Sequence, residues 1–169
     1  MSEGLLAGTK NRLLQILARF APGATTLRVT LHRWRGVKIG ENVWIGYDVI
    51  LDTSYPYLVT IKDRASVGMR ATIIAHMREA RSVTIEEDAI VGPGSLVLPN
   101  VTIGRGAIVT AGSVVSTSVP PMTMVQGNPA IPVAKCGVPL GKNVTLKEFS
   151  KRLKPIASRP LNIKREEPS

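Results

Sequence analysis

Aliphatic residues recur at every sixth position through the middle of the chain, and small residues, often glycine, follow many of them. A period of six matches neither the 3.6-residue turn of an α-helix nor the two-residue alternation of a long β-strand. It is typical of short strands joined by tight corners. The recurring positions are Ile39, Ile45 and Leu51, then Ile61, Val67 and Ile73, and finally Ile85, Val91, Val97, Ile103, Val109 and Val115.

A longer repeat of eighteen residues contains this period of six. The segments VTIEEDAIVGPGSLVLPN (83–100) and VTIGRGAIVTAGSVVSTS (101–118) are identical at nine of eighteen positions. Three six-residue units make one triangular coil, and stacked coils pair as parallel strands roughly 4.8 Å apart. Internal repeats of this kind predict a solenoid with an aliphatic core. The stacked pairs expected in it are Ile85 with Ile103, Val91 with Val109, and Val97 with Val115.

Four coils fit this repeat, with two short insertions between them. A solenoid tolerates insertions at its corners, where they leave as loops. The insertions are YPYL (55–58) and MREARS (77–82), so His76 ends the second coil directly before the longer loop. The predicted coils are residues 37–54, 59–76, 83–100 and 101–118.

The two ends of the chain have different patterns. Residues 5–21 carry apolar side chains at helical spacing, and residues 22–36 predict a second short helix or an extended lead-in. We expect this segment to cap the first open coil. Residues 145–154 predict a short basic helix. The expected organisation is a helical cap at 1–36, a solenoid domain at 37–134 and a basic extension at 135–169.

Composition narrows the environment of the protein. Hydrophobic residues make up 44% of the chain but aromatic residues only 4%, so Val, Ile, Leu and Ala must build the core. There is no run of eighteen apolar residues, and the N-terminus lacks the features of a signal peptide. The single cysteine, Cys136, has no partner for an internal disulfide. We therefore expect a cytoplasmic protein.

The net charge of +10 is concentrated at the two ends. Residues 1–36 hold six basic and one acidic residue, and residues 135–169 hold nine basic and three acidic residues. The region between them is nearly neutral, which argues against a nucleic-acid groove along the solenoid. Basic ends suit contact with an anionic membrane surface, so a peripheral membrane contact is one hypothesis for them.

Several motifs resemble the hexapeptide-repeat acyltransferases. These are AGSVVS (111–116), VPP (119–121) and GNPA (127–130), together with NVWIG, LDTSYP and IIAH before a loop. They are most similar to the maltose, galactoside and streptogramin O-acetyltransferases and to bacterial polysaccharide O-acetyltransferases. The resemblance implies an all-β fold, a left-handed parallel β-helix. It also implies a homotrimer with active sites between subunits and acetyl-CoA as the acyl donor.

The chain contains two histidines, and the resemblance matches His76 to the family's general base. Transfer of an acyl group to a hydroxyl needs a proton acceptor near neutral pH, which suits imidazole. His32 lies among basic residues, and we expect a structural or solvated role for it. Glu79 is a candidate carboxylate partner of His76, with a backbone carbonyl as the alternative. A plain surface loop is the other interpretation of residues 77–82.

The resemblance also implies a coenzyme A site on the later coils. The family's usual Lys and Arg positions hold Thr117, Ile131 and Ala134, so Lys135 becomes the nearest candidate for a phosphate contact. Glycines at these corners are equally explained by the tight turn. The expected cofactor-binding residues are Gly94, Ala111, Gly112, Ser116, Asn128, Pro129 and Lys135.

Four residues near the two insertions are candidates for the acceptor site: Asp52, Tyr55, Tyr57 and Arg78. A carboxylate and aromatic rings suit the hydroxyls and apolar faces of a sugar, although a turn-capping Asp and packing tyrosines are an equal alternative.

The function expected from the sequence is O-acetyl transfer from acetyl-CoA to a sugar or glycan hydroxyl in a ternary complex. N-acetylation of an amino sugar and a non-catalytic β-helix scaffold remain alternatives. A zinc-dependent carbonic anhydrase of similar fold needs three histidines, so we expect no metal.

Overall fold

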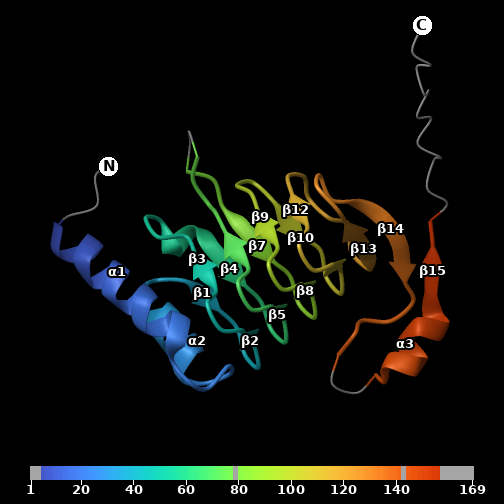
Figure 1. Ribbon diagram of the computed structural model, residues 1–169, viewed down its shortest axis with the longest axis horizontal. Coiled ribbons are helices and arrows are strands. Elements are labelled where there is room, and N and C mark those ends of the chain that lie inside the picture. Colours follow the sequence, from blue (N-terminus) through green and yellow to red (C-terminus); the bar gives the residue numbers. More distant parts are fainter. Residues whose placement is uncertain (1–4, 78–79, 142–143, 157–169) are drawn as a thin grey trace, which may run out of the picture.

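The computed structural model describes residues 5–77, 80–141 and 144–156, and its centre is a β-solenoid with three faces of parallel strands (Figure 1). The first face contains β1 (Lys38–Ile39), β4 (Val59–Ile61), β7 (Val83–Ile85) and β10 (Thr102–Ile103). The second face contains β2 (Trp44–Ile45), β5 (Ser66–Val67), β8 (Ile90–Val91) and β11 (Ile108–Val109). The third contains β3 (Ile50–Leu51), β6 (Thr72–Ile73), β9 (Leu96–Val97) and β12 (Val114–Val115).

The observed strand pairing confirms the predicted stacking. The stacked residues are eighteen positions apart, and all of their side chains are buried in one aliphatic core. The first insertion also leaves at a corner, as expected: residues 56–58 form a 3₁₀ turn, η1 (Pro56–Leu58). The confirmed pairs are Ile85 with Ile103, Val91 with Val109, and Val97 with Val115.

Gly46, Gly68 and Gly92 stack at one corner of the solenoid because the backbone of the next coil passes directly beside each of them. A Cβ added to Gly68 would lie 2.5 Å from the backbone nitrogen of Pro93. A Cβ on Gly92 would lie 2.6 Å from that of Ala111. These contacts are too short for any side chain, so the close approach of coils requires glycine here.

The helices α1 (Leu5–Phe20) and α2 (Leu27–Trp34) cap the first coil, as predicted (Figure 1). The face of α1 that does so is the polar one. Asn11 and Gln15 are buried, and their amide groups donate to the carbonyl oxygens of Thr53 at 2.7 Å and Val49 at 2.9 Å. Because no coil precedes the first one, its outer backbone carbonyl groups have no strand to pair with, and these polar side chains donate hydrogen bonds to them instead. The apolar side chains at helical spacing point outward instead: Leu13, Ile16, Leu17 and Phe20 are exposed.

The other end of the solenoid is closed by an antiparallel sheet. Strand β13 (Thr123–Gln126) continues the second face and pairs with β14 (Ile131–Cys136), which pairs with β15 (Leu153–Pro155). The predicted C-terminal helix is α3 (Leu146–Arg152), whose first turn is capped by the Thr145 hydroxyl. Among the described residues, no helix has the length and apolar character needed to cross a bilayer.

Candidate functional site

His76 and Asp52 form a hydrogen-bonded pair at the edge of the first two coils. Asp52 follows β3 directly, and His76 follows the neighbouring strand β6, so strand pairing brings them together although they are 24 residues apart. The Nδ1 atom of His76 lies 2.6 Å from Oδ2 of Asp52. The imidazole is partly open, with 36% of its side chain exposed, whereas the Asp52 side chain is fully buried.

The Asp52 carboxylate is held by several donors. Its Oδ1 accepts from the backbone N–H groups of Ser54 at 2.9 Å and Tyr55 at 2.8 Å, and its Oδ2 accepts from Ala75 at 2.6 Å. Burial by itself would raise the pKa of Asp52, but the hydrogen bonds from Tyr55, His76, Ala75 and Ser54 outweigh it and lower that pKa. An ionised carboxylate only accepts hydrogen bonds, so Nδ1 of His76 carries the hydrogen and Nε2 presents a lone pair. The pair can therefore accept a proton from a bound molecule.

This position of Asp52 corrects the role expected for it. A carboxylate that is fully buried and already bonded to four donors cannot contact an acceptor molecule. Asp52 orients the imidazole, which is the task that the sequence suggested for Glu79. Both Glu79 and Arg78 lie outside the described residues. The sequence signal for the pair was that both residues follow the third strand of their coils, Asp52 by one position and His76 by three.

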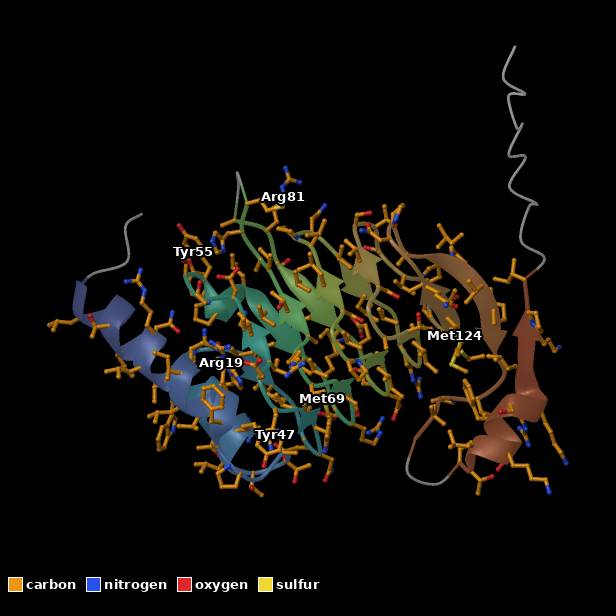
Figure 2. All side chains as sticks on the ribbon, in the orientation of Figure 1. Arg19, Tyr47, Tyr55, Met69, Arg81 and Met124 are labelled. Carbon is orange, nitrogen blue, oxygen red and sulfur yellow. The ribbon has the colours of Figure 1, made fainter. Side chains whose placement is uncertain are left out.

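Two tyrosines extend from the imidazole. The Tyr55 ring contacts the His76 ring edge-on, with centroids 5.3 Å apart, and Tyr57 contacts Tyr55 with centroids 6.0 Å apart. Tyr57 is exposed. The structure thus brings three of the predicted residues, His76, Tyr55 and Tyr57, to one edge, where Figure 2 shows Tyr55 and Arg81. Aromatic rings beside a proton acceptor suit a ligand with both apolar faces and hydroxyl groups.

Arg35 supports Asp52 from behind, a contact that the sequence did not reveal. Its buried guanidinium donates to the carbonyl oxygens of Asp52 at 2.6 Å and Leu51 at 2.8 Å. It also donates to Asn11 Oδ1 at 2.7 Å and to Gln15 Oε1. The cap helices and the His76–Asp52 pair therefore belong to one hydrogen-bonded network.

His32 is structural, one of the two roles expected for it. It is fully buried in the cap, and its Nδ1 lies 3.0 Å from a guanidinium nitrogen of Arg35. Burial, together with the positive charges of Arg35 and Arg28, lowers the pKa of His32 to about 3. The ring is therefore neutral at physiological pH and has no access to a ligand.

Most of the predicted cofactor residues lie at exposed positions around the third face on the later coils. Gly94 and Gly112 occupy stacked corners with φ of +67° and +68°, and an added Cβ at either would meet nothing within 4 Å. The turn that contains Asn128 and Pro129 is held beside them, since Gly127 N–H donates to Ser113 Oγ at 3.2 Å. Ala111 and Ser116 are exposed at the two edges of this face.

Lys135 lies apart from these residues. It pairs with Thr123 on the antiparallel sheet, at the opposite end of the β13–β14 hairpin from the Asn128–Pro129 turn. Its Nζ donates to Thr123 Oγ1 at 2.8 Å. Cys136, the next residue, is buried, and burial raises the pKa of its thiol. Within residues 5–77, 80–141 and 144–156, no three His, Cys, Asp or Glu side chains are close enough to bind a metal ion together.

Known proteins share this sequence pattern and fold. The family described as "Bacterial transferase hexapeptide (six repeats)" matches residues 82–117. The chain is 30% identical over 125 residues to "Putative acetyltransferase YvoF" of Bacillus subtilis (strain 168), which covers 71% of this chain and 73% of that protein.

Two solved structures show the same fold at low sequence identity. The hexapeptide-repeat acetyltransferase VCA0836 of Vibrio cholerae has a TM-score of 0.64 and 23% identity, over 77% of this chain and 90% of that chain. That protein has also been solved in complex with acetyl coenzyme A. A maltose O-acetyltransferase from Clostridium difficile 630 has a TM-score of 0.60 and 18% identity, over 78% of this chain and 88% of that chain.

Proposed function

This chain belongs to the hexapeptide-repeat acetyltransferase family, and on this basis we propose that it transfers an acetyl group from acetyl-CoA to a hydroxyl of a sugar or glycan. The observation that carries the proposal is the His76–Asp52 pair, with Nδ1 and Oδ2 at 2.6 Å. A β-helix that served only as a scaffold would have no need of a partly exposed imidazole oriented by a buried carboxylate.

His76 acts as the general base in this proposal. Its Nε2 takes the proton of the acceptor hydroxyl while that oxygen attacks the thioester carbonyl. The new C–O bond forms, the C–S bond breaks, and the proton passes from His76 to the departing sulfur of coenzyme A. Asp52 fixes the tautomer throughout and stabilises the imidazolium that forms in between. Cys136 takes no part, because its thiol is buried and its pKa is raised.

The acceptor is proposed to bind against the tyrosines beside the imidazole. The Tyr55 and Tyr57 rings are perpendicular to each other, at 83°, and Tyr57 is exposed. Such rings offer stacking surface to the apolar faces of a sugar, while His76 lies within ring contact of Tyr55. Acetyl-CoA is proposed to lie along the third face, where Gly94, Gly112 and the Asn128–Pro129 turn leave open surface.

We propose that a homotrimer completes the site. In the single chain the imidazole lies on an outer edge of the solenoid and is 36% exposed, and the described residues around it do not enclose both a thioester and an acceptor. A neighbouring copy would supply the opposite wall and exclude water, which strengthens the electrostatic interactions of the site.

The proposal is tested by incubating the purified protein with acetyl-CoA and a panel of sugars and glycans, with detection of free thiol and of the acetylated product. We expect thiol release that depends on a hydroxyl-bearing acceptor. The His32→Gln variant is the matched histidine control and should keep its turnover. Failure of calorimetry to detect any affinity for coenzyme A would refute the proposal, and acetylation of amino groups alone would redirect it to N-acetyl transfer.

A further inference from the structure

Helix α1 is packed with its polar side toward the protein and its apolar side toward solvent. The side chains of Asn11, Gln15 and Ala18 are buried against the first coil. On the opposite side lies a stripe of apolar side chains, each more than half exposed, which we call the α1 outer face. It consists of Leu6, Leu13, Ile16, Leu17 and Phe20. Figure 2 shows side chains along this outer side of the helix, away from the coils.

The apolar surface continues from α1 onto α2. Ile16, Leu17 and Phe20 line a shallow hollow of about 510 Å³ together with Ala21, Leu27 and Leu31. Contiguous apolar surface of this kind marks a site of interaction with a partner or a membrane. Single exposed apolar residues are common on proteins, but a stripe that follows helical spacing over four turns is not.

The charged side chains of α1 and α2 are all basic, and one of them, Arg19, is paired with Asp48. Residues 5–40 contain seven Lys and Arg residues and no Asp or Glu. Lys10 is exposed and lies one turn from Leu6 and Leu13, and Arg12 is exposed and lies one turn from Ile16. A helix with Leu and Phe on one side and Lys and Arg along its borders has the composition of a segment that lies in a membrane interface.

We propose that the α1 outer face binds the surface of an anionic lipid bilayer. Apolar side chains enter the boundary between headgroups and acyl chains, and Lys10 and Arg12 contact the lipid phosphates. The helix has 16 residues and is therefore about 24 Å long, which suits a helix that lies flat and is short of the bilayer's thickness. A second copy of the same face is disfavoured, because it would bring the Lys10 and Arg12 side chains that border one stripe close to those that border the other.

Membrane binding would also fix the orientation of the molecule. Asn11 and Gln15 hydrogen-bond to the carbonyl oxygens of Thr53 and Val49, so α1 is attached to the coil that carries Asp52. The coil that carries Asp52 then lies about one helix diameter, roughly 10 Å, from the lipid surface. The proposal itself does not depend on acetyl transfer, since binding is measured without substrates.

The test is co-sedimentation of the full-length protein with vesicles of phosphatidylcholine, with and without phosphatidylglycerol. We expect roughly tenfold more protein to sediment with the anionic vesicles, and this excess to fall as salt is raised. The double variant Leu13→Ser, Leu17→Ser should lose the binding. Its control is Ile131→Ser, Leu146→Ser, which removes exposed apolar side chains at the other end of the molecule and should bind like the wild type.

A second pair of variants separates the two basic ends. The double variant Lys10→Gln, Arg12→Gln should bind anionic vesicles more weakly than the wild type. The double variant Lys147→Gln, Lys151→Gln on α3 should keep most of the vesicle binding of the wild type. Circular dichroism checks that each variant is folded. Absence of wild-type binding, or its loss only in the α3 variant, would overturn the proposal. The proposal would also be overturned if the wild type did not bind vesicles and the Leu13→Ser, Leu17→Ser variant formed a smaller assembly than the wild type. The α1 outer face would then be a contact between protein chains.

Discussion

The cap and the coil edge each contain one histidine, and the two rings have opposite surroundings. Nδ1 of His32 faces a guanidinium nitrogen of Arg35 at 3.0 Å, while Nδ1 of His76 faces the Asp52 carboxylate at 2.6 Å. Burial, together with the positive charge of the first neighbour, keeps the His32 ring neutral. The second neighbour accepts a hydrogen bond and so determines which nitrogen of His76 carries the hydrogen. The sign of the neighbour and access to solvent, rather than the residue type, separate a packing histidine from a reactive one.

The largest expected effect follows from removing the exposed ring. His76→Ala should lower kcat on the order of 10²–10⁴-fold, because it removes the partly exposed ring proposed to accept the proton. Affinity for coenzyme A should stay close to that of the wild type, as measured by calorimetry. A variant that kept nearly full turnover would remove His76 from the mechanism.

The next effect follows from changing the partner of that ring. Asp52→Asn should lower kcat on the order of 10²-fold, since the imidazole stays in place but loses the anion that fixes its tautomer. The KM for acetyl-CoA should change little. Asp48→Asn is the matched control, because Asp48 pairs with Arg19 at 2.6 Å near the surface and not with His76. Equal losses in both variants would contradict a specific role for Asp52.

A smaller effect concerns His32 and pH. Its pKa is lowered to about 3 in the folded protein, so between the ordinary value and 3 only the unfolded chain takes up the proton. Stability contributed by the neutral ring is therefore present above the ordinary pKa and is lost as pH falls. Between pH 7 and pH 5, His32 should lower the free energy of unfolding by about 2 kcal/mol.

Urea unfolding at several pH values checks this. His32→Gln keeps a hydrogen-bond acceptor for Arg35 but cannot be protonated, so its stability should fall less between pH 7 and pH 5 than that of the wild type. Parallel curves for the two proteins would show that His32 does not cause the acid sensitivity.

The last effect, also on stability, concerns the link between the cap and the site. Gln15→Ala removes the amide that donates to the Val49 carbonyl oxygen and accepts from Arg35. It should lower the free energy of unfolding by about 1–3 kcal/mol. Gln126→Ala, at an exposed position, is the control and should be near neutral. A loss of kcat in Gln15→Ala beyond tenfold would mean that the network also tunes His76.

The solenoid could be predicted almost entirely from the sequence because its cause is local and repeated. The six-residue spacing of buried aliphatic residues determines which strands stack, and pairs such as Ile85 with Ile103 follow by counting. The antiparallel strands β14 and β15 could not be counted in this way. Their pairing depends on chain reversal at residues 127–130 and on contacts with α3, outside the repeat.

The site could be predicted only in part. The position of His76 at a coil edge followed from the repeat, but its contact with Asp52 crosses an insertion and depends on side-chain orientation. The side of α1 that packs against the first coil also could not be predicted from the sequence. Apolar spacing shows that a helix has an apolar side, but here the open carbonyl groups of the first coil attract Asn11 and Gln15 instead.

The glycines stacked at one corner restrict how this protein can change in length during evolution. A residue inserted within a coil would shift a side chain into the position of Gly68 or Gly92, where a Cβ lies 2.5–2.6 Å from the neighbouring backbone. Insertions and deletions are therefore confined to whole coils or to the junctions between them. Those junctions, at residues 55–58 and 77–82, flank His76. The chain can thus vary the loops beside His76 while its scaffold stays fixed, so changes in these loops need not disturb the packing of the core.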